Sequence, residues 1–273
     1  MKIVSQFLAA KTGEAEECED GIVVTEDFAA VIDGATDTTG RRYNGITGGR
    51  YAMLACADAI RTLNAKADAK AAISHLTEIL AERLPLNPPP DENPMAVAAI
   101  YSEARREIWQ IGDVGFWYPG LPAGGVKPHK AVDRYAADIR AAVLRAELAN
   151  GADPAKLAQS DSGREAILSL LTHQSIFCNN AGAGEWAYAA LDGKPVEFDL
   201  VTVQPVPDDV NTVVIASDGY PIILPTLQAS EELLASLLTE DPLCIGPLLG
   251  TKGVFPGNAS YDDRAYLNIR VLL

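Results

Sequence analysis

Cysteine and positive charge are both scarce in this sequence. The four cysteines, Cys18, Cys56, Cys178 and Cys244, lie far apart and form no Cys-x-x-Cys pair. This spacing argues against a zinc ribbon or a dithiol redox site and favours reduced, structural thiols. Lys and Arg number 22 against 37 Asp and Glu, so the net charge is −15. Because nucleic acids and anionic membranes repel a protein of that charge, we expect neither as a partner.

Long apolar runs and linkers are also missing. No stretch reaches the roughly 18 consecutive apolar residues that indicate a membrane-spanning helix. The first apolar stretch, residues 3–10, is interrupted by Ser5 and Gln6 and followed by acidic residues from Glu14, which is not the pattern of a signal peptide. We therefore expect a soluble, cytoplasmic protein. With 48% hydrophobic residues, no repeat and no Gly/Ser linker, we expect one domain over residues 1–273.

Short apolar runs and polar turns predict a mixture of hairpins and helices. Paired β-branched runs predict hairpins at residues 21–32 and 95–111. Apolar residues at helical spacing, such as Ile73, Leu76 and Leu80, predict helices. The expected helices are residues 50–64, 69–84, 131–150, 163–173 and 230–238, and the further strands are residues 196–203, 212–217 and 264–273. A proline-rich connection is expected at residues 85–94. Helices follow pairs of strands, so the predicted fold class is α+β.

Acidic residues stand at four of the predicted strand ends. Glu19 and Asp20 precede the first strand, Asp33 follows the second, Asp218 follows a late strand and Asp263 precedes the last. If these strands are neighbours, their ends bring several carboxylates together. Hard divalent cations such as Mg²⁺ and Mn²⁺ prefer oxygen ligands of this kind, whereas the three histidines show no metal-ligand spacing. The alternative is that each acid only forms a turn.

Five segments resemble the signature blocks of a known family when they are taken in order. They read ECED, FAAVIDGAT, IWQIGDVGFWY, TVVIASDGY and SYDDRAYLNIRV. The metal-dependent (type 2C) serine/threonine protein phosphatases carry similar blocks in the same order, and the resemblance runs from Cys18 to the end of the chain. It implies a four-layer αββα sandwich of two antiparallel sheets flanked by helices. It also implies two or more Mn²⁺ or Mg²⁺ ions in a cleft at one end.

Carried over position by position, the resemblance predicts the metal ligands. Asp33 resembles the carboxylate that bridges two ions, and Gly34 resembles the residue that offers its carbonyl oxygen. Asp218 and Asp263 resemble the ligands of the other ion. In this register Arg264 occupies the position where Asn is usual in the family.

Three more acids have weaker expected roles. Glu19 resembles an acid that holds an ion through water, and Asp20 resembles an acid that supports the ligands from behind. Asp113 either supports an additional ion or only forms a turn. No side chain is expected to act as the nucleophile, because the resemblance implies direct attack by a metal-activated water on a phosphoserine or phosphothreonine of a protein substrate.

The chain departs from the family at further positions, among them the residues after Asp33-Gly34 and the turn Gly112-Asp113-Val114-Gly115. Ala15 stands where many members have an arginine that grips the substrate phosphate, and Lys11 or the pair Arg41 and Arg42 would have to substitute for it. A helical insertion at about residues 127–174 lies where the family has a variable flap. These departures leave open a catalytically weak, metal-binding phosphoprotein sensor and a phosphatase for a small metabolite. We expect a monomer.

Overall fold

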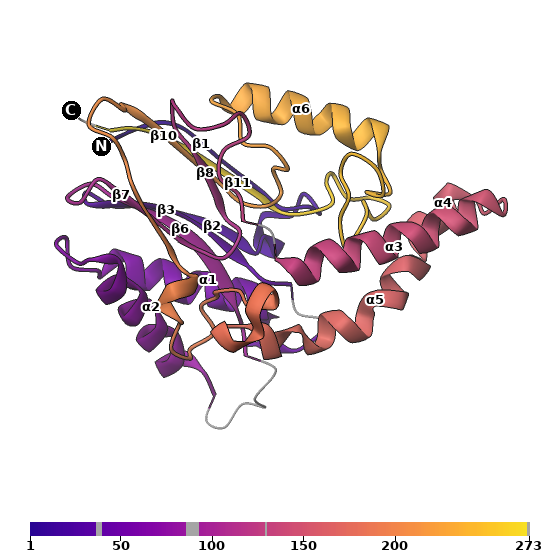
Figure 1. Cartoon of the computed structure of the whole chain (residues 1–273), viewed down its shortest axis with the longest axis horizontal. Helices are drawn as coiled ribbons and strands as arrows, with labels where there is room; N and C mark the ends of the chain where they lie inside the picture. The colour runs from indigo at the N-terminus through magenta and orange to yellow at the C-terminus, as the bar shows by residue number, and fades with distance from the viewer. Residues whose placement is uncertain (37–39, 86–92, 129, 272–273) are drawn as a thin grey trace.

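Two antiparallel β-sheets lie face to face in the computed structural model, which describes residues 1–36, 40–85, 93–128 and 130–271 (Figure 1). One sheet has the strand order β1 (Lys2–Ala9), β11 (Arg264–Arg270), β10 (Thr212–Ala216) and β8 (Gly115–Trp117). The other has the order β2 (Asp20–Val24), β3 (Phe28–Gly34), β6 (Ala96–Ser102), β7 (Glu107–Ile111) and β9 (Thr202–Pro205). A small ribbon of β4 (Arg42–Tyr43) and β5 (Ile46–Thr47) leads into the first helix.

Helices cover the outer faces of both sheets. The α-helices are α1 (Gly48–Arg61), α2 (Ala69–Arg83), α3 (Ala131–Ala149), α4 (Pro154–Gln159), α5 (Ser162–His173) and α6 (Leu227–Glu240). Short 3₁₀ turns occupy Ala15–Glu17, Gln174–Phe177, Ala181–Trp186 and Phe198–Leu200. Figure 1 shows α1 and α2 under the five-stranded sheet, α6 over the four-stranded sheet, and α3 to α5 extending from one end. Within the described residues, none of these helices has the length and apolar character needed to cross a bilayer.

Strand β3, between β2 and β6 in the five-stranded sheet, contacts both the second sheet and the helices. Ala29 and Val31 face the second sheet, whereas Phe28, Ala30 and Ile32 face α1 and α2. Because both faces of the strand are buried, its sequence is a continuous apolar run rather than an alternation. Each buried apolar side chain contributes about 1.5–3 kcal/mol relative to an exposed one. The strand therefore anchors the acid at its end, Asp33, to the middle of the core.

The structure confirms the predicted α+β class and the αββα order of layers. Both predicted hairpins form, and the five predicted helices form within a few residues of their expected bounds. The strand expected over residues 196–203 is partly wrong, because residues 198–200 form a 3₁₀ turn and β9 starts at Thr202. Of the connection expected over residues 85–94, residues 86–92 lie outside the described residues.

Sequence reasoning missed β1 and β8. Residues 3–10 were compared only with the pattern of a signal peptide. The side chains of β1 nevertheless alternate strictly between exposed and partly buried. That alternation is the pattern of a strand with one covered face, and β1 lies at the edge of its sheet. β8 has three residues, which is too short for a periodic signal.

The helical insertion consists of α3, α4 and α5, and one buried arginine ties it to a distant loop. The guanidinium of Arg140 on α3 is fully buried. It pairs with Asp161 before α5, and it donates hydrogen bonds to the carbonyl oxygens of Leu243, Cys244 and Gly250. Because a buried guanidinium is tolerated only when its donors are satisfied, these bonds fix the insertion against residues 243–250.

Candidate functional site

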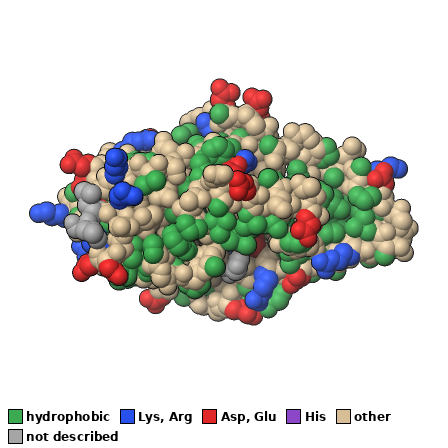
Figure 2. All heavy atoms as spheres, turned by 90° about the horizontal axis from the view of Figure 1, so that it is seen from above, with side chains coloured by type: hydrophobic (Ala, Val, Ile, Leu, Met, Phe, Trp, Pro, Cys, Tyr) green, Lys and Arg blue, Asp and Glu red, His purple; other side chains and the backbone are tan. Residues whose placement is uncertain are grey.

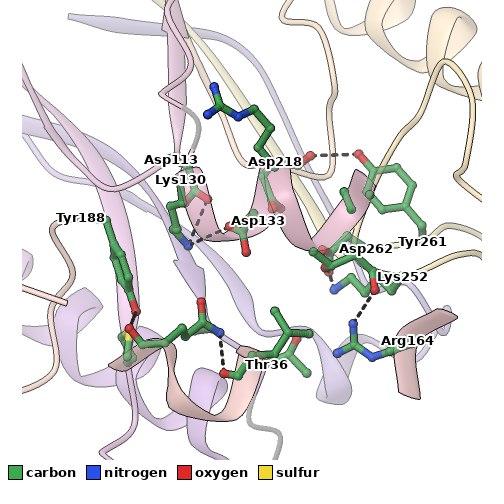
Figure 3. A pocket seen from close by; sticks show the side chains of 18 of the residues that line it. Thr36, Asp113, Lys130, Asp133, Arg164, Tyr188, Asp218, Lys252, Tyr261 and Asp262 are labelled. Carbon is green, nitrogen blue, oxygen red and sulfur yellow. Dashed lines mark hydrogen bonds and ion pairs between the residues drawn. The ribbon is translucent and has the colours of Figure 1, made fainter. Parts of the chain in front are cut away.

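A large cavity opens where the strand ends of both sheets meet the helical insertion. Its volume is about 930 Å³. Asp113 follows β7, Asp218 follows β10 and Asp262 precedes β11, and all three line this cavity. Arg134 and Arg164, which come from the insertion, line the same cavity. Figure 3 shows the three acids projecting into the same space. Residues that are far apart in the sequence therefore share one site.

Asp20 and Asp33 lie next to this cavity without lining it. They are paired directly across β2 and β3. Two like charges at directly opposed positions destabilise a sheet. Asp20 is almost fully buried, and its Oδ2 has no hydrogen-bond partner in the described part of the chain. A repulsive, incompletely satisfied pair at the centre of the fold points to a functional role rather than a structural one.

The two Asp-Gly pairs at the site are needed for close packing. A Cβ on Gly34 would lie 2.3 Å from the carbonyl oxygen of Gly49, and a Cβ on Gly219 would lie 2.0 Å from that of Asp263. Neither glycine has a positive φ. Only glycine permits these approaches of backbone to backbone. The glycines thus allow the segments that carry Asp33 and Asp218 to lie tightly against their neighbours.

The backbone of Asp218 is held by two long side chains. The hydroxyl of Tyr261 donates to the carbonyl oxygens of Asp218 and Gly219, at 3.0 and 3.2 Å. The ammonium of Lys127 donates to the carbonyl oxygens of Asp218 and Tyr220, both at 3.1 Å. These bonds fix the turn and leave the Asp218 carboxylate directed into the cavity (Figure 3).

Burial and mutual repulsion raise the pKa of three of the acids. Burial raises the pKa of Asp20 and that of Asp33 well above the usual range, and neighbouring carboxylates raise both further. Burial, followed by repulsion from Asp262, raises the pKa of Asp218 to about 6. Burial is the main cause of these shifts, and the repulsion between neighbouring carboxylates adds to it.

Lysines neutralise the remaining acids in part. Burial raises the pKa of Asp262, but the ammonium groups of Lys252 and Lys11 outweigh it, so the net pKa is lowered. The Lys252 Nζ lies 2.6 Å from Asp262 Oδ2. Similarly, the Lys130 Nζ lies 3.1 Å from Asp113 Oδ2. Both ammonium groups occupy positions at which a metal ion would compete for the carboxylate.

Asp262 and Asp263 have different environments, although they are neighbours in sequence. Both oxygens of Asp263 accept backbone N–H groups, from Lys11 at 2.7 Å and from Glu19 at 2.8 Å. Asp263 is buried and does not line the cavity, whereas Asp262 does. Successive side chains in an extended segment point to opposite sides. The geometry therefore favours Asp262 as a metal ligand, whereas the sequence predicted Asp263 for that role.

The residues fit a hard divalent cation. Asp33, Asp218 and Asp262 offer carboxylate oxygens, and the buried Oε1 of Glu19, like Asp20 Oδ2, has no partner among the described residues. Such oxygen donors suit Mg²⁺ and Mn²⁺. In the described part of the chain, however, no three His, Cys, Asp or Glu side chains stand close enough to form a metal site as they are. The metal ligands hence remain a prediction.

Arg41 and Arg42 lie away from the acids. Neither lines the large cavity, and both surround a separate cavity of about 400 Å³ that also includes Arg83. The prediction that they hold the substrate phosphate is not supported by this placement. Sequence reasoning missed Lys252 and Arg164, which do line the large cavity. No local motif marks them, since their partners are distant in sequence.

No protein-family model matches the chain, and no curated protein matches it at a significant level. Solved structures resemble it weakly over almost its whole length. They include the serine/threonine phosphatase PstP/Ppp of Mycobacterium tuberculosis, at 14% identity, a TM-score of 0.47 and 98% coverage of both chains. RsbX in complex with magnesium has 12% identity and a TM-score of 0.45 over 98% of this chain and 94% of its own. Stp1 from Staphylococcus aureus has 11% identity and a TM-score of 0.47 over 100% and 96%. These likenesses are too distant to assign an activity to this chain.

We expect Asp218→Asn to stabilise the metal-free protein at pH 8. The raised pKa of Asp218, about 6 against 3.8 unfolded, means that the native state holds this proton more tightly. The stability from this group is complete below about pH 4 and is lost as the pH rises through about 6. Asn removes that loss, so urea unfolding in EDTA should show a gain of about 1–3 kcal/mol at pH 8. Near pH 4 the gain should vanish.

The control for this measurement is Asp209→Asn, because Asp209 is exposed and lies outside the site. Its stability should stay within about 0.5 kcal/mol of the wild type at either pH. Equal stability of the wild type and Asp218→Asn at pH 8 would contradict the proposed repulsion.

We expect Asp262→Asn and Asp263→Asn to differ in kind. Asp262→Asn should weaken Mn²⁺ binding by about tenfold or more, as measured by calorimetric titration, because it removes a ligand charge. Asp263→Asn should retain Mn²⁺ binding but lose about 1–3 kcal/mol of stability in urea, since one backbone N–H loses its acceptor. The opposite pattern would restore Asp263 as the ligand.

Proposed function

We propose that the chain is a divalent-metal-dependent phosphomonoesterase that acts on phosphoserine and phosphothreonine in proteins. The observation that carries the proposal is the set of buried or partly buried, mutually repelling carboxylates at the strand ends, with raised pKa values at Asp20, Asp33 and Asp218. Divalent cations would stabilise such a set of carboxylates by neutralising their charge. The ordered sequence blocks that resemble the type 2C phosphatases support the same reaction.

Asp33, Asp218 and Asp262 would hold the ions, with Asp20 behind them. When bound, divalent ions would supply an activated water and neutralise charge on the phosphoryl group. The protein's own part is to hold the carboxylates in position. Tyr261 and Lys127 do this for Asp218 by fixing its backbone.

The remaining cavity wall suits an anionic substrate. The described lining residues include five cations, Lys127, Lys130, Arg134, Arg164 and Lys252. On the face drawn in Figure 2, by contrast, Lys and Arg are scattered and form no large patch. Four acids, Asp113, Asp133, Asp218 and Asp262, line the same cavity, so the five cations would favour a negatively charged ligand once divalent ions neutralise these acids. The volume of about 930 Å³ accommodates a phosphorylated segment of a peptide chain.

A second function is favoured by the lysines on the acids. Lys252 pairs with Asp262, and Lys130 pairs with Asp113. Each ammonium competes with a metal ion for its carboxylate, which would weaken metal binding. A phosphoprotein-binding module with little turnover is therefore the alternative, and tight binding of a phosphopeptide without hydrolysis would identify it.

Hydrolysis of a phosphothreonine peptide and of p-nitrophenyl phosphate distinguishes these functions. We expect turnover with Mn²⁺ or Mg²⁺, none in EDTA, and a loss on the order of 10²-fold or more in kcat for Asp33→Asn. Asp209→Asn, at an exposed site, is the matched control and should keep wild-type rates. A folded, metal-supplemented wild type with no turnover on either substrate would overturn the phosphatase proposal.

A further inference from the structure

Arg164 is a partly buried arginine that the described structure provides with no anionic partner. It lies in the first turn of α5 and lines the large cavity. Its Nη1 donates to the carbonyl oxygen of Thr251 at 2.8 Å. Within the described ranges, the side chain forms no other hydrogen bond and no ion pair. A guanidinium has five N–H donors, so most of its capacity remains available to a ligand.

The position of Arg164 is fixed from both sides. Its backbone N–H donates to Asp161 Oδ1, which caps α5. The other oxygen of Asp161 is paired with Arg140. Thr251 belongs to the loop that Arg140 holds through the carbonyl oxygen of Gly250. The guanidinium is therefore directed by its helix and by this loop, and little side-chain entropy remains to be lost when an anion binds.

The charges around Arg164 favour the binding of an anion. Burial lowers the pKa of Arg164, and Arg140 lowers it further, although Asp161 and Asp262 oppose both effects. Asp161 is already engaged by Arg140, and Asp262 is already engaged by Lys252. A partly buried charge without its own counter-ion is unfavourable unless a ligand supplies one.

The position of Arg164 in the cavity indicates which anion would bind. In Figure 3, Arg164 lies beside Lys252 and Asp262, across the cavity from Lys130 and Tyr188. The cavity lining thus contains both the proposed cation-binding acids and a guanidinium that lies close to one of them, Asp262. A phosphate monoester matches both, because its oxygens can face metal ions and accept two parallel N–H bonds from an arginine.

We propose that Arg164 binds the phosphoryl oxygens of the substrate, so that the helical insertion supplies the phosphate-binding residue of the site. This inference rests on the proposed function for its substrate, but its test separates the two. The insertion is then part of the substrate site, and its anchoring by Arg140 keeps Arg164 in place.

The experiment compares Arg164→Gln, Arg164→Lys and the control Arg61→Gln. Arg61 is exposed on α1 and pairs with Asp58 away from the cavity. Three quantities are measured on Mg²⁺-supplemented protein: KM and kcat for a phosphothreonine peptide, and the calorimetric Kd for inorganic phosphate. Arg164→Gln should raise KM and the phosphate Kd by about tenfold or more, as expected for loss of a charge-assisted hydrogen bond.

Arg164→Lys should recover part of this binding, because it restores the charge without the two-pronged geometry. Arg61→Gln should match the wild type. If Arg164→Gln does not fold, as judged by its circular dichroism, Arg164→Lys decides the question through a phosphate Kd several-fold weaker than that of the wild type.

The outcomes distinguish this inference from the proposed function. Wild-type hydrolysis with unchanged KM and phosphate Kd in the Arg164 variants would overturn the role of Arg164 and leave the phosphatase function standing. Phosphate binding that weakens in Arg164→Gln, with no hydrolysis by any variant, would support Arg164 and overturn the phosphatase function. Absence of phosphate binding by the wild type would overturn the role of Arg164.

Discussion

The crowding of buried and partly buried carboxylates at the strand ends is the constraint on which the candidate site depends. Asp20 and Asp33 are opposed across two strands, and Asp218 and Asp262 join them from the other sheet. Burial is the main cause of the raised pKa of Asp33, and repulsion from the neighbouring carboxylates raises this pKa further. The two apolar layers that flank β3 hold the group together despite this unfavourable energy. Native proteins retain such unfavourable clusters mainly at functional sites, where a ligand compensates for them.

Two kinds of cation would offset the repulsion among the carboxylates: the lysines of the chain and the proposed divalent ions. Lys11 and Lys252 lower the pKa of Asp262, whereas Asp20 and Asp33 keep raised pKa values. The lysines therefore neutralise one part of the site, and the proposed divalent ions would neutralise the other. Arg164, which lines the same cavity, forms no ion pair within the described ranges, and its guanidinium donates only to the carbonyl oxygen of Thr251. A phosphorylated ligand in the cavity would contact both the proposed ions and this guanidinium.

Part of this arrangement could be predicted from the sequence. The apolar run that ends at Asp33 indicates a buried strand with an acid at its end, and the ordered blocks indicated the αββα sandwich. The choice between Asp262 and Asp263 could not be made in this way, because it depends on which side of an extended segment faces the cavity. Only the bonds from Lys11 and Glu19 to Asp263 settle that orientation.

Long-range contacts account for the rest of what sequence reasoning missed. Arg164 is directed by Thr251, which lies 87 residues further along the chain. The sequence predicts Arg41 and Arg42 as phosphate-binding residues because they are close to Asp33 along the chain, yet they surround a different cavity. Proximity along the chain is thus a poor guide to the cations of this site, since strand ends from both sheets and a separate helical layer build it.

The most direct test of the account is a crystal structure of the Mn²⁺-soaked protein with anomalous scattering data. The account predicts anomalous peaks within coordination distance of the carboxylates of Asp33, Asp218 and Asp262, about 2.0–2.3 Å as for oxygen ligands of small divalent ions. Lys252 should then have moved off Asp262. Anomalous density elsewhere on the protein, with Lys252 still paired to Asp262 and no ion among these acids, would contradict the central claim.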